Sequence, residues 1–132
     1  PSERYTTFLN ELSDNLAALK GVDWVHAYDR IVPYGELFST AIIADYLQQE
    51  LPVKWADARE MITTDEFHTE ANIRWEKTQK KVQTLLSPLL DQFIVVTQGF
   101  IGATIAGITT TLGREGSDFT GAILANCLEA ES

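Results

Sequence analysis

The chain has 132 residues, 45% of them hydrophobic, and carries 10 Lys and Arg against 19 Asp and Glu, a formal net charge of −9. This length suits one compact domain with a single core. The acidic balance repels phosphate backbones and anionic lipid, so neither nucleic acid nor a membrane surface is expected as a partner. No apolar run reaches the roughly 18 residues that a membrane-spanning helix needs.

The residues that most often bind metals or form disulfides are scarce in this chain. The single cysteine, Cys127, has no partner for an internal disulfide, which fits a reducing cytoplasm. It lies in an apolar helical stretch, so burial as a small hydrophobic residue is expected. The two separated histidines, His26 and His68, do not make a Cys/His zinc site, and no metal ligands are predicted. The first residues do not resemble a signal peptide, so a cytoplasmic location is expected.

The N-terminal third has the apolar periodicity of three helices. The first is predicted to end at Gly21. The second begins near Trp24 and is predicted to break at residues 33–35, Pro-Tyr-Gly, after which Glu36 opens a third helix through Leu47. The apolar residues that define the periodicity are Tyr5, Phe8, Leu9, Leu12, Leu16 and Leu19 in the first helix, with Leu37, Phe38, Ala41 and Ile42 expected to face inward in the third.

The middle of the chain is more polar. Residues 53–56 are predicted to form a short strand, and residues 57–70 a loop. A mostly polar helix is expected from about residue 71 to 87, where Pro88 ends it. Its charged residues are predicted to form a solvated face rather than a binding patch: Arg74, Glu76, Lys77, Lys80 and Lys81.

The last third contains the strongest strand signals. The β-branched run at residues 93–97 is typical of a strand buried on both faces, and residues 108–112 form a second such run. A turn is expected at residues 113–117, followed by a helix from near Asp118. Helices flanking buried strands predict a layered α/β fold. Since about five strands is usual for such a sheet and only three are predicted, we expect a piece of a larger domain.

The turn that follows residue 112 has the composition of an anion site. Arg114 is the only basic residue after Lys81, and it lies at the carboxyl end of a strand, where ligands of α/β sheets bind. Ser117 or Asp118 can cap the next helix, whose first N–H groups attract an anion. An ordinary capped turn with an exposed arginine remains the alternative, and no Walker A lysine follows. Likewise, a favourable charge at the start of a helix remains the alternative to a functional role for Glu36.

Four blocks of sequence resemble aspartate kinases. Residues 109–118, Thr-Thr-Thr-Leu-Gly-Arg-Glu-Gly-Ser-Asp, are similar to the family signature Thr-Thr-Leu-Gly-Arg-Gly-Gly-Ser-Asp. Residues 35–40, 62–67 and 96–102 resemble further blocks in the same order. Residues 57–59 and 62–67 make the monofunctional type closer than the type fused to homoserine dehydrogenase. Glu115 replaces the second glycine of the signature, where an extra negative charge opposes phosphate binding.

The resemblance implies an α/β fold, the three-layer αβα amino-acid-kinase (carbamate kinase-like) fold, here partial, with few strands and about five helices. Residues 1–132 would form part of the catalytic domain. The family's N-terminal Lys-Phe-Gly-Gly element with its catalytic lysine, the nucleotide segment after the last helix and the regulatory ACT domains are all missing from this sequence.

The implied activity is transfer of the ATP γ-phosphoryl group to the side-chain carboxylate of L-aspartate, giving 4-phospho-L-aspartate. This is the first step of lysine, threonine and methionine biosynthesis. ATP with Mg²⁺ would be bound mainly by parts of the parent enzyme outside this chain, and the parent is expected to be a homo-oligomer. A non-catalytic amino-acid-binding module, or another amino-acid kinase of the same fold, remains the alternative.

The resemblance also assigns the residues that bind aspartate. Arg114 corresponds to the arginine that holds the α-carboxylate, a role that suits its planar pair of donors. Glu36 corresponds to the glutamate that binds the α-ammonium group. Ser117 would donate a hydrogen bond to aspartate, and Gly99 and Phe100 would form part of the pocket wall.

Three residues are assigned to the reacting phosphates. Asp118 corresponds to the aspartate that orients a catalytic lysine or a metal-bound group. Gly113 and Gly116 correspond to glycines that let the backbone approach the nucleotide.

Overall fold

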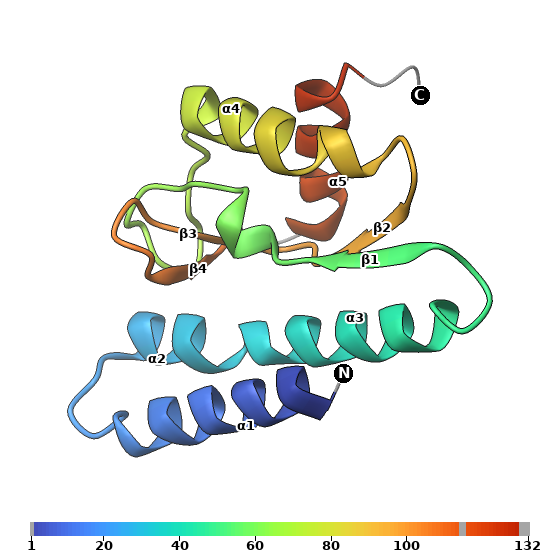
Figure 1. Cartoon of the computed structure of the whole chain (residues 1–132). Helices are drawn as coiled ribbons and strands as arrows, with labels where there is room; N and C mark the ends of the chain where they lie inside the picture. Colours follow the sequence, from blue (N-terminus) through green and yellow to red (C-terminus); the bar gives the residue numbers. More distant parts are fainter. Residues whose placement is uncertain (1, 114–115, 130–132) are drawn as a thin grey trace.

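The computed structural model describes residues 2–113 and 116–129, which form three layers (Figure 1). Helices α1, α2 and α3 lie on one side of the strands, and α4 and α5 lie on the other. This arrangement confirms the predicted layered α/β architecture. The elements are α1 (Ser2–Ala17), α2 (Trp24–Ile31), α3 (Pro33–Leu47), β1 (Val53–Ala56), η1 (Ala58–Glu60), α4 (Trp75–Leu85), η2 (Ser87–Leu89), β2 (Ile94–Thr97), β3 (Ile101–Ala103), β4 (Thr109–Thr111) and α5 (Gly116–Cys127).

The strands form two pairs. β1 and β2 are parallel, with Val53 opposite Ile94, and the connection between them carries α4, as a parallel pair requires. β3 and β4 form an antiparallel hairpin, with Ile101 opposite Thr111. The stretch after η1 runs beside β3, because the Ala103 N–H donates to the Ile62 carbonyl oxygen at 3.0 Å.

Two hydrophobic cores lie on opposite sides of the strands. The chain crosses between the two cores just after η1, since Met61 belongs to one core and its neighbour Ile62 to the other. The core beneath α1 and α3 contains Phe8, Tyr34, Leu37, Ala41, Ala58, Ile62 and Ile101. The core beneath α4 and α5 contains Met61, Ala71, Val82, Leu86, Leu112, Ile123 and Cys127.

The predicted break between the second and third helices is present but falls at Val32 and not at residues 33–35, because α3 begins at Pro33 and runs through Gly35. Proline suits the first turn of a helix, where its missing N–H has no helical partner. Nothing lies within 4 Å of where a Cβ of Gly35 would be, so close packing does not require glycine there. Ile42 was expected to face inward and is 58% exposed, whereas Leu37 and Ala41 are buried.

Other boundaries shift where extended backbone replaces the predicted helix or loop. The segment before α4 is extended because the Ala71 N–H bonds the Thr111 carbonyl oxygen at 3.0 Å, so α4 begins at Trp75. β3 was not predicted, and α5 begins at Gly116, before Asp118. β2 is not buried on both faces, since Ile94 is 50% exposed. β1 matches its predicted bounds, and the charged residues of α4 are exposed, as predicted.

The structure also bears on the cysteine, on membrane-spanning helices and on groups of metal-binding side chains. Cys127 is buried, as expected, and burial raises the pKa of its thiol. None of the helices in the described part of the chain is long and apolar enough to cross a membrane. Within residues 2–113 and 116–129, no group of three or more His, Cys, Asp or Glu side chains is placed to hold a metal ion.

Gly102 and Gly121 give opposite predictions for substitution by alanine. A Cβ at Gly102 would lie 2.8 Å from the backbone oxygen of Ile62, so Gly102→Ala should destabilise the fold by about 1–3 kcal/mol. Gly121 lies inside α5 with nothing within 4 Å, so Gly121→Ala should stabilise by about 0.5–1 kcal/mol. Urea unfolding of both variants measures the two changes. Equal stabilities would show that β3 does not pack against residue 62 this closely.

Candidate functional site

A pocket of about 620 Å³ opens beside α2, the loop before α4 and the first turn of α5. Five residues assigned from the sequence contribute to its lining. Its lining residues are Trp24, Tyr28, Thr69, Glu70, Phe100, Gly113, Gly116, Ser117 and Asp118. Trp24, Tyr28, Thr69 and Glu70 were not among the predicted site residues.

The turn after β2 and the start of α5 touch through glycines. A Cβ at Gly99 would lie 2.8 Å from both Cα and Oγ of Ser117. In the same way, a Cβ at Gly116 would lie 2.8 Å from Cδ1 of Phe100. Both positions therefore require glycine, and this close contact places Ser117 beside the Phe100 wall of the pocket.

Phe100 adopts a left-handed backbone conformation, with φ at 75°, which costs free energy in a residue with a bulky side chain. Hydrogen bonds hold it there. Its N–H donates to the Thr120 hydroxyl at 3.0 Å, and that hydroxyl donates to the Gly116 carbonyl oxygen at 2.7 Å. The Phe100 carbonyl oxygen accepts from the Leu112 N–H at 2.9 Å. These bonds fix Phe100 between the turn after β2 and the first turn of α5.

The first turn of α5 contributes partial positive charge to one end of the pocket. Gly116, Ser117 and Asp118 all lie in this turn, where backbone N–H groups have no partner within the helix. The helix dipole adds partial positive charge at the same end. The exposed Ser117 hydroxyl and Asp118 carboxylate face the same space, so the pocket offers a donor and a carboxylate beside a helix N-terminus.

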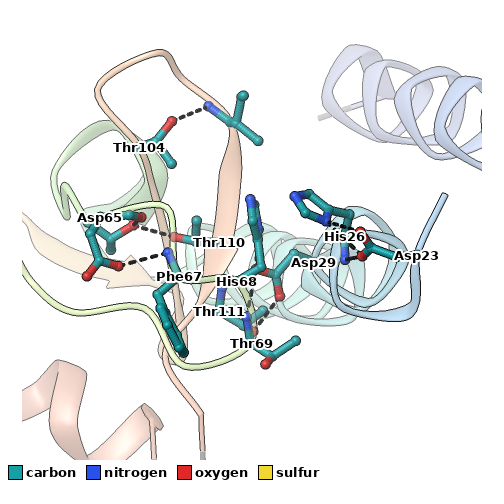
Figure 2. Close-up of polar contacts among 12 residues, drawn as sticks. Asp23, His26, Asp29, Asp65, Phe67, His68, Thr69, Thr104, Thr110 and Thr111 are labelled. Atoms are coloured by element: carbon teal, nitrogen blue, oxygen red, sulfur yellow. Dashed lines mark hydrogen bonds and ion pairs between the residues drawn. The ribbon is translucent and has the colours of Figure 1, made fainter.

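The loop that carries Thr69 and Glu70 into the pocket is organised by Asp65. Its carboxylate accepts a bond from the Phe67 N–H at 3.0 Å (Figure 2). It also accepts from the Asn72 N–H at 3.0 Å and from the Asn72 side-chain amide at 2.9 Å. Partial burial raises the pKa of Asp65, but these hydrogen bonds outweigh it and hold the pKa below its usual value.

Asp29 is a buried carboxylate that sequence reasoning missed. It is 1% exposed and accepts hydrogen bonds from His68 Nδ1 at 2.8 Å and the Thr69 N–H at 3.1 Å. The Thr111 N–H and hydroxyl also donate to it, at 3.2 and 2.6 Å (Figure 2). A signal was present, because Asp29 lies four residues after Val25 and three before Val32, on the apolar face of its helix.

Gln98 fixes the start of the Gly99 turn from the other side. Its side-chain oxygen accepts from the Ala58 N–H at 2.7 Å, and its amide donates to the Thr40 hydroxyl at 2.9 Å. The Trp55 indole N–H donates to the same hydroxyl at 3.0 Å. Thr40 in turn donates to the Glu36 carbonyl oxygen at 2.8 Å, which ties the turn to α3.

Two of the predicted substrate contacts are not among the lining residues of this pocket that the structure describes. Glu36 lies half-buried in the first turn of α3 and is not among the described lining residues. Arg114 and its neighbour Glu115 lie outside the described residues. The predicted approach of Arg114 and Glu36 across a cleft therefore stays a prediction.

Comparison with known sequences gives a consistent result. Residues 9–132 match the amino acid kinase family. Lysine-sensitive aspartokinase 3 of Escherichia coli (strain K12) is 38% identical over 103 residues, or 77% of this chain. The aspartokinase of Chlamydia muridarum (strain MoPn / Nigg) is 35% identical over 104 residues, or 76% of this chain. The matched region spans 23% of each of these two proteins, less than a quarter of their length.

Solved structures show the same relationship. The chain superposes on E. coli aspartokinase III in complex with aspartate and ADP with a TM-score of 0.86 and 32% identity. That match covers 98% of this chain and 29% of the E. coli chain. Clostridium acetobutylicum aspartate kinase gives a TM-score of 0.72 at 25% identity, covering 96% of this chain and 25% of that one. The predicted amino-acid-kinase fold is confirmed, in partial form.

The Thr120 hydroxyl gives a test of how Phe100 is held. Thr120→Val removes the acceptor of the Phe100 N–H while keeping the side-chain volume, and should destabilise the chain by about 1–3 kcal/mol. Thr120→Ser keeps the hydroxyl and should preserve that hydrogen bond. Urea unfolding, with hydrogen exchange at the Phe100 amide, compares the two. Unchanged protection of that amide in Thr120→Val would show that another group holds the turn.

Proposed function

Because the chain belongs to the amino acid kinase family, we propose that it is part of an aspartate kinase, which phosphorylates the side-chain carboxylate of L-aspartate with ATP. The observation that carries the proposal is the composition of the pocket. Phe100 comes from one family-like block and Gly113, Gly116, Ser117 and Asp118 from another, yet all five line the same space. The E. coli relative was solved with aspartate and ADP, which supports these two ligand classes.

In the proposed complex, aspartate binds against the Phe100 wall. Ser117 lies at the helix N-terminus, where its hydroxyl donates to a substrate carboxylate. Arg114 follows Gly113 directly and would hold the α-carboxylate with two parallel donors. Glu36 would bind the α-ammonium group from the first turn of α3.

The phosphates are proposed to approach the start of α5. The residues present fit such a group, since the first turn of α5, at the positive end of the helix dipole, lines the pocket. Gly113 adds a left-handed turn, with φ at 84°. ATP would supply the phosphoryl group, and Mg²⁺ would neutralise its charge. Asp118 would orient a cationic group beside the phosphates, and the chain's main contribution is to align the two substrates.

The proposal extends to the whole protein. Residues 1–132 would be one part of the catalytic domain, with the catalytic lysine and most of the nucleotide site in other parts. The parent enzyme would be a cytoplasmic homo-oligomer of the monofunctional type, acting at the start of lysine, threonine and methionine biosynthesis.

The 132-residue chain alone is predicted to lack aspartate kinase activity, because the lysine-bearing turn and the adenine site would lie elsewhere. The assay traps aspartyl phosphate as its hydroxamate, with purified chain, ATP and aspartate. The complete parent protein serves as the positive control. Product formation by the isolated chain would contradict the proposed division of the site.

In the parent protein, Arg114→Lys is predicted to fail almost as badly as Arg114→Ala, because a lysine offers a point charge rather than two parallel donors. Losing a hydrogen bond to a charged group costs about 1.5–3 kcal/mol, or roughly 10- to 150-fold in kcat/KM for aspartate. Glu115→Gly should be tolerated, since it restores the common signature. Near-normal kcat/KM in Arg114→Lys at saturating ATP would reject the assigned role.

A further inference from the structure

We propose that Asp29 is a positioning residue for the amino-acid pocket: from outside the cavity, its carboxylate sets the relative placement of three walls. The inference rests on the proposed function, because its readout is the binding of aspartate. Asp29 itself is not among the described lining residues, and it touches the pocket only through the residues it holds. It is a positioning residue and not a catalytic one.

The first wall is α2. Asp29 follows Tyr28, which lines the pocket, and Trp24 lies one turn earlier, with its ring centroid 5.2 Å from that of Tyr28. The aromatic pair therefore moves with the helix segment that carries Asp29. Because α2 has only the residues Trp24–Ile31, it lacks the length to hold this orientation by itself.

The second wall is the loop that contains Thr69 and Glu70. Asp29 accepts from the N–H of Thr69, a lining residue, and from Nδ1 of His68 beside it. The His68 ring also packs on His26 of α2, with ring centroids 4.3 Å apart. Figure 2 shows His68 and Thr69 of the loop beside Asp29. The loop and α2 are thus joined at two points.

The third wall begins at the end of β4. Thr111 donates to Asp29 with both its N–H and its hydroxyl, the shorter bond being 2.6 Å. Two residues later the chain reaches Gly113, a lining residue with φ at 84°, and then the first turn of α5. The position of β4 therefore determines where the anion-attracting end of α5 starts.

Because the Asp29 carboxylate is buried, it needs hydrogen-bond donors from the protein. Asp29 is 1% exposed, and no lysine or arginine within the described ranges forms an ion pair with it. A buried carboxylate in such a place depends on its hydrogen-bond donors, and charge-assisted bonds of this kind are the strong ones. The donors come from two segments that are distant in the sequence, so the carboxylate is satisfied only when all three walls are in place.

The test compares substitutions in the complete parent enzyme. Asp29→Ala leaves four donors without an acceptor, and should raise KM for aspartate about 10-fold or more. Asp29→Asn keeps the shape but loses the charge, and Thr111→Val loses one donor, so each should raise KM for aspartate about 3-fold. KM for ATP should rise less than KM for aspartate in all of them, because only the phosphates are proposed to meet the first turn of α5 and the rest of the nucleotide is bound mainly elsewhere.

A matched control separates positioning from general stability. Thr78 is equally buried, and its hydroxyl bonds both the N–H and the carbonyl oxygen of Thr63, but it does not line the pocket. Thr78→Val should therefore lower the melting temperature and leave KM for aspartate unchanged. If Asp29→Ala does not fold, the Asn and Thr111→Val variants carry the test.

The outcomes distinguish the two proposals. A parent enzyme without aspartate kinase activity would overturn the proposed function. An active parent whose Asp29→Asn and Thr111→Val variants keep the wild-type KM for aspartate would overturn the positioning role alone. An equal rise in KM for aspartate and KM for ATP in the Asp29 variants would also overturn it, because it would indicate only a loss of stability. So would a rise in KM for aspartate of the same size in Thr78→Val.

Discussion

The Asp29 carboxylate is buried inside the protein. Hydrogen bonds from His68, Thr69 and Thr111 replace the water that it loses on folding. Removing such a group from water is costly unless every acceptor position finds a donor. The backbone of the loop and of β4 must therefore lie within hydrogen-bond distance of α2 in the folded state. Once these three segments are fixed, the positions of the lining residues next to them in the sequence are restricted as well.

Gln98 plays a comparable part for the turn that carries Phe100. Its amide reaches Thr40 on α3 and Ala58 after β1, so the end of β2 is fixed to both. Asp29 joins the loop and β4 to α2, and Gln98 joins the turn after β2 to α3. The contact between Gly99 and Ser117 then joins the turn to α5 without any intervening side chain. Buried polar groups thus fix the position of a pocket whose walls combine two helices with the loops between other elements.

The sequence predicted those elements whose formation depends mainly on neighbouring residues in the chain. β1 appeared at its predicted residues because its apolar run is short and bounded, and the glycine turn before α5 carried its own pattern. β3 escaped prediction because it has only the residues Ile101–Ala103 and depends on pairing with β4 and with the backbone of Ile62. Asp29 escaped because a single charged residue on a helix says nothing about donors that lie far along the chain. Pockets assembled from distant segments can be inferred from sequence mainly through family patterns.

The separation of these donors has a consequence for how the chain acquires its structure. The bond from Thr111 to Asp29 spans 82 residues, and contacts of such long range form slowly because a large loop must close first. During synthesis α2 leaves the ribosome well before β4 exists, and its carboxylate must remain solvated until then. The pocket can therefore be completed only after β4 has been synthesised and has reached α2.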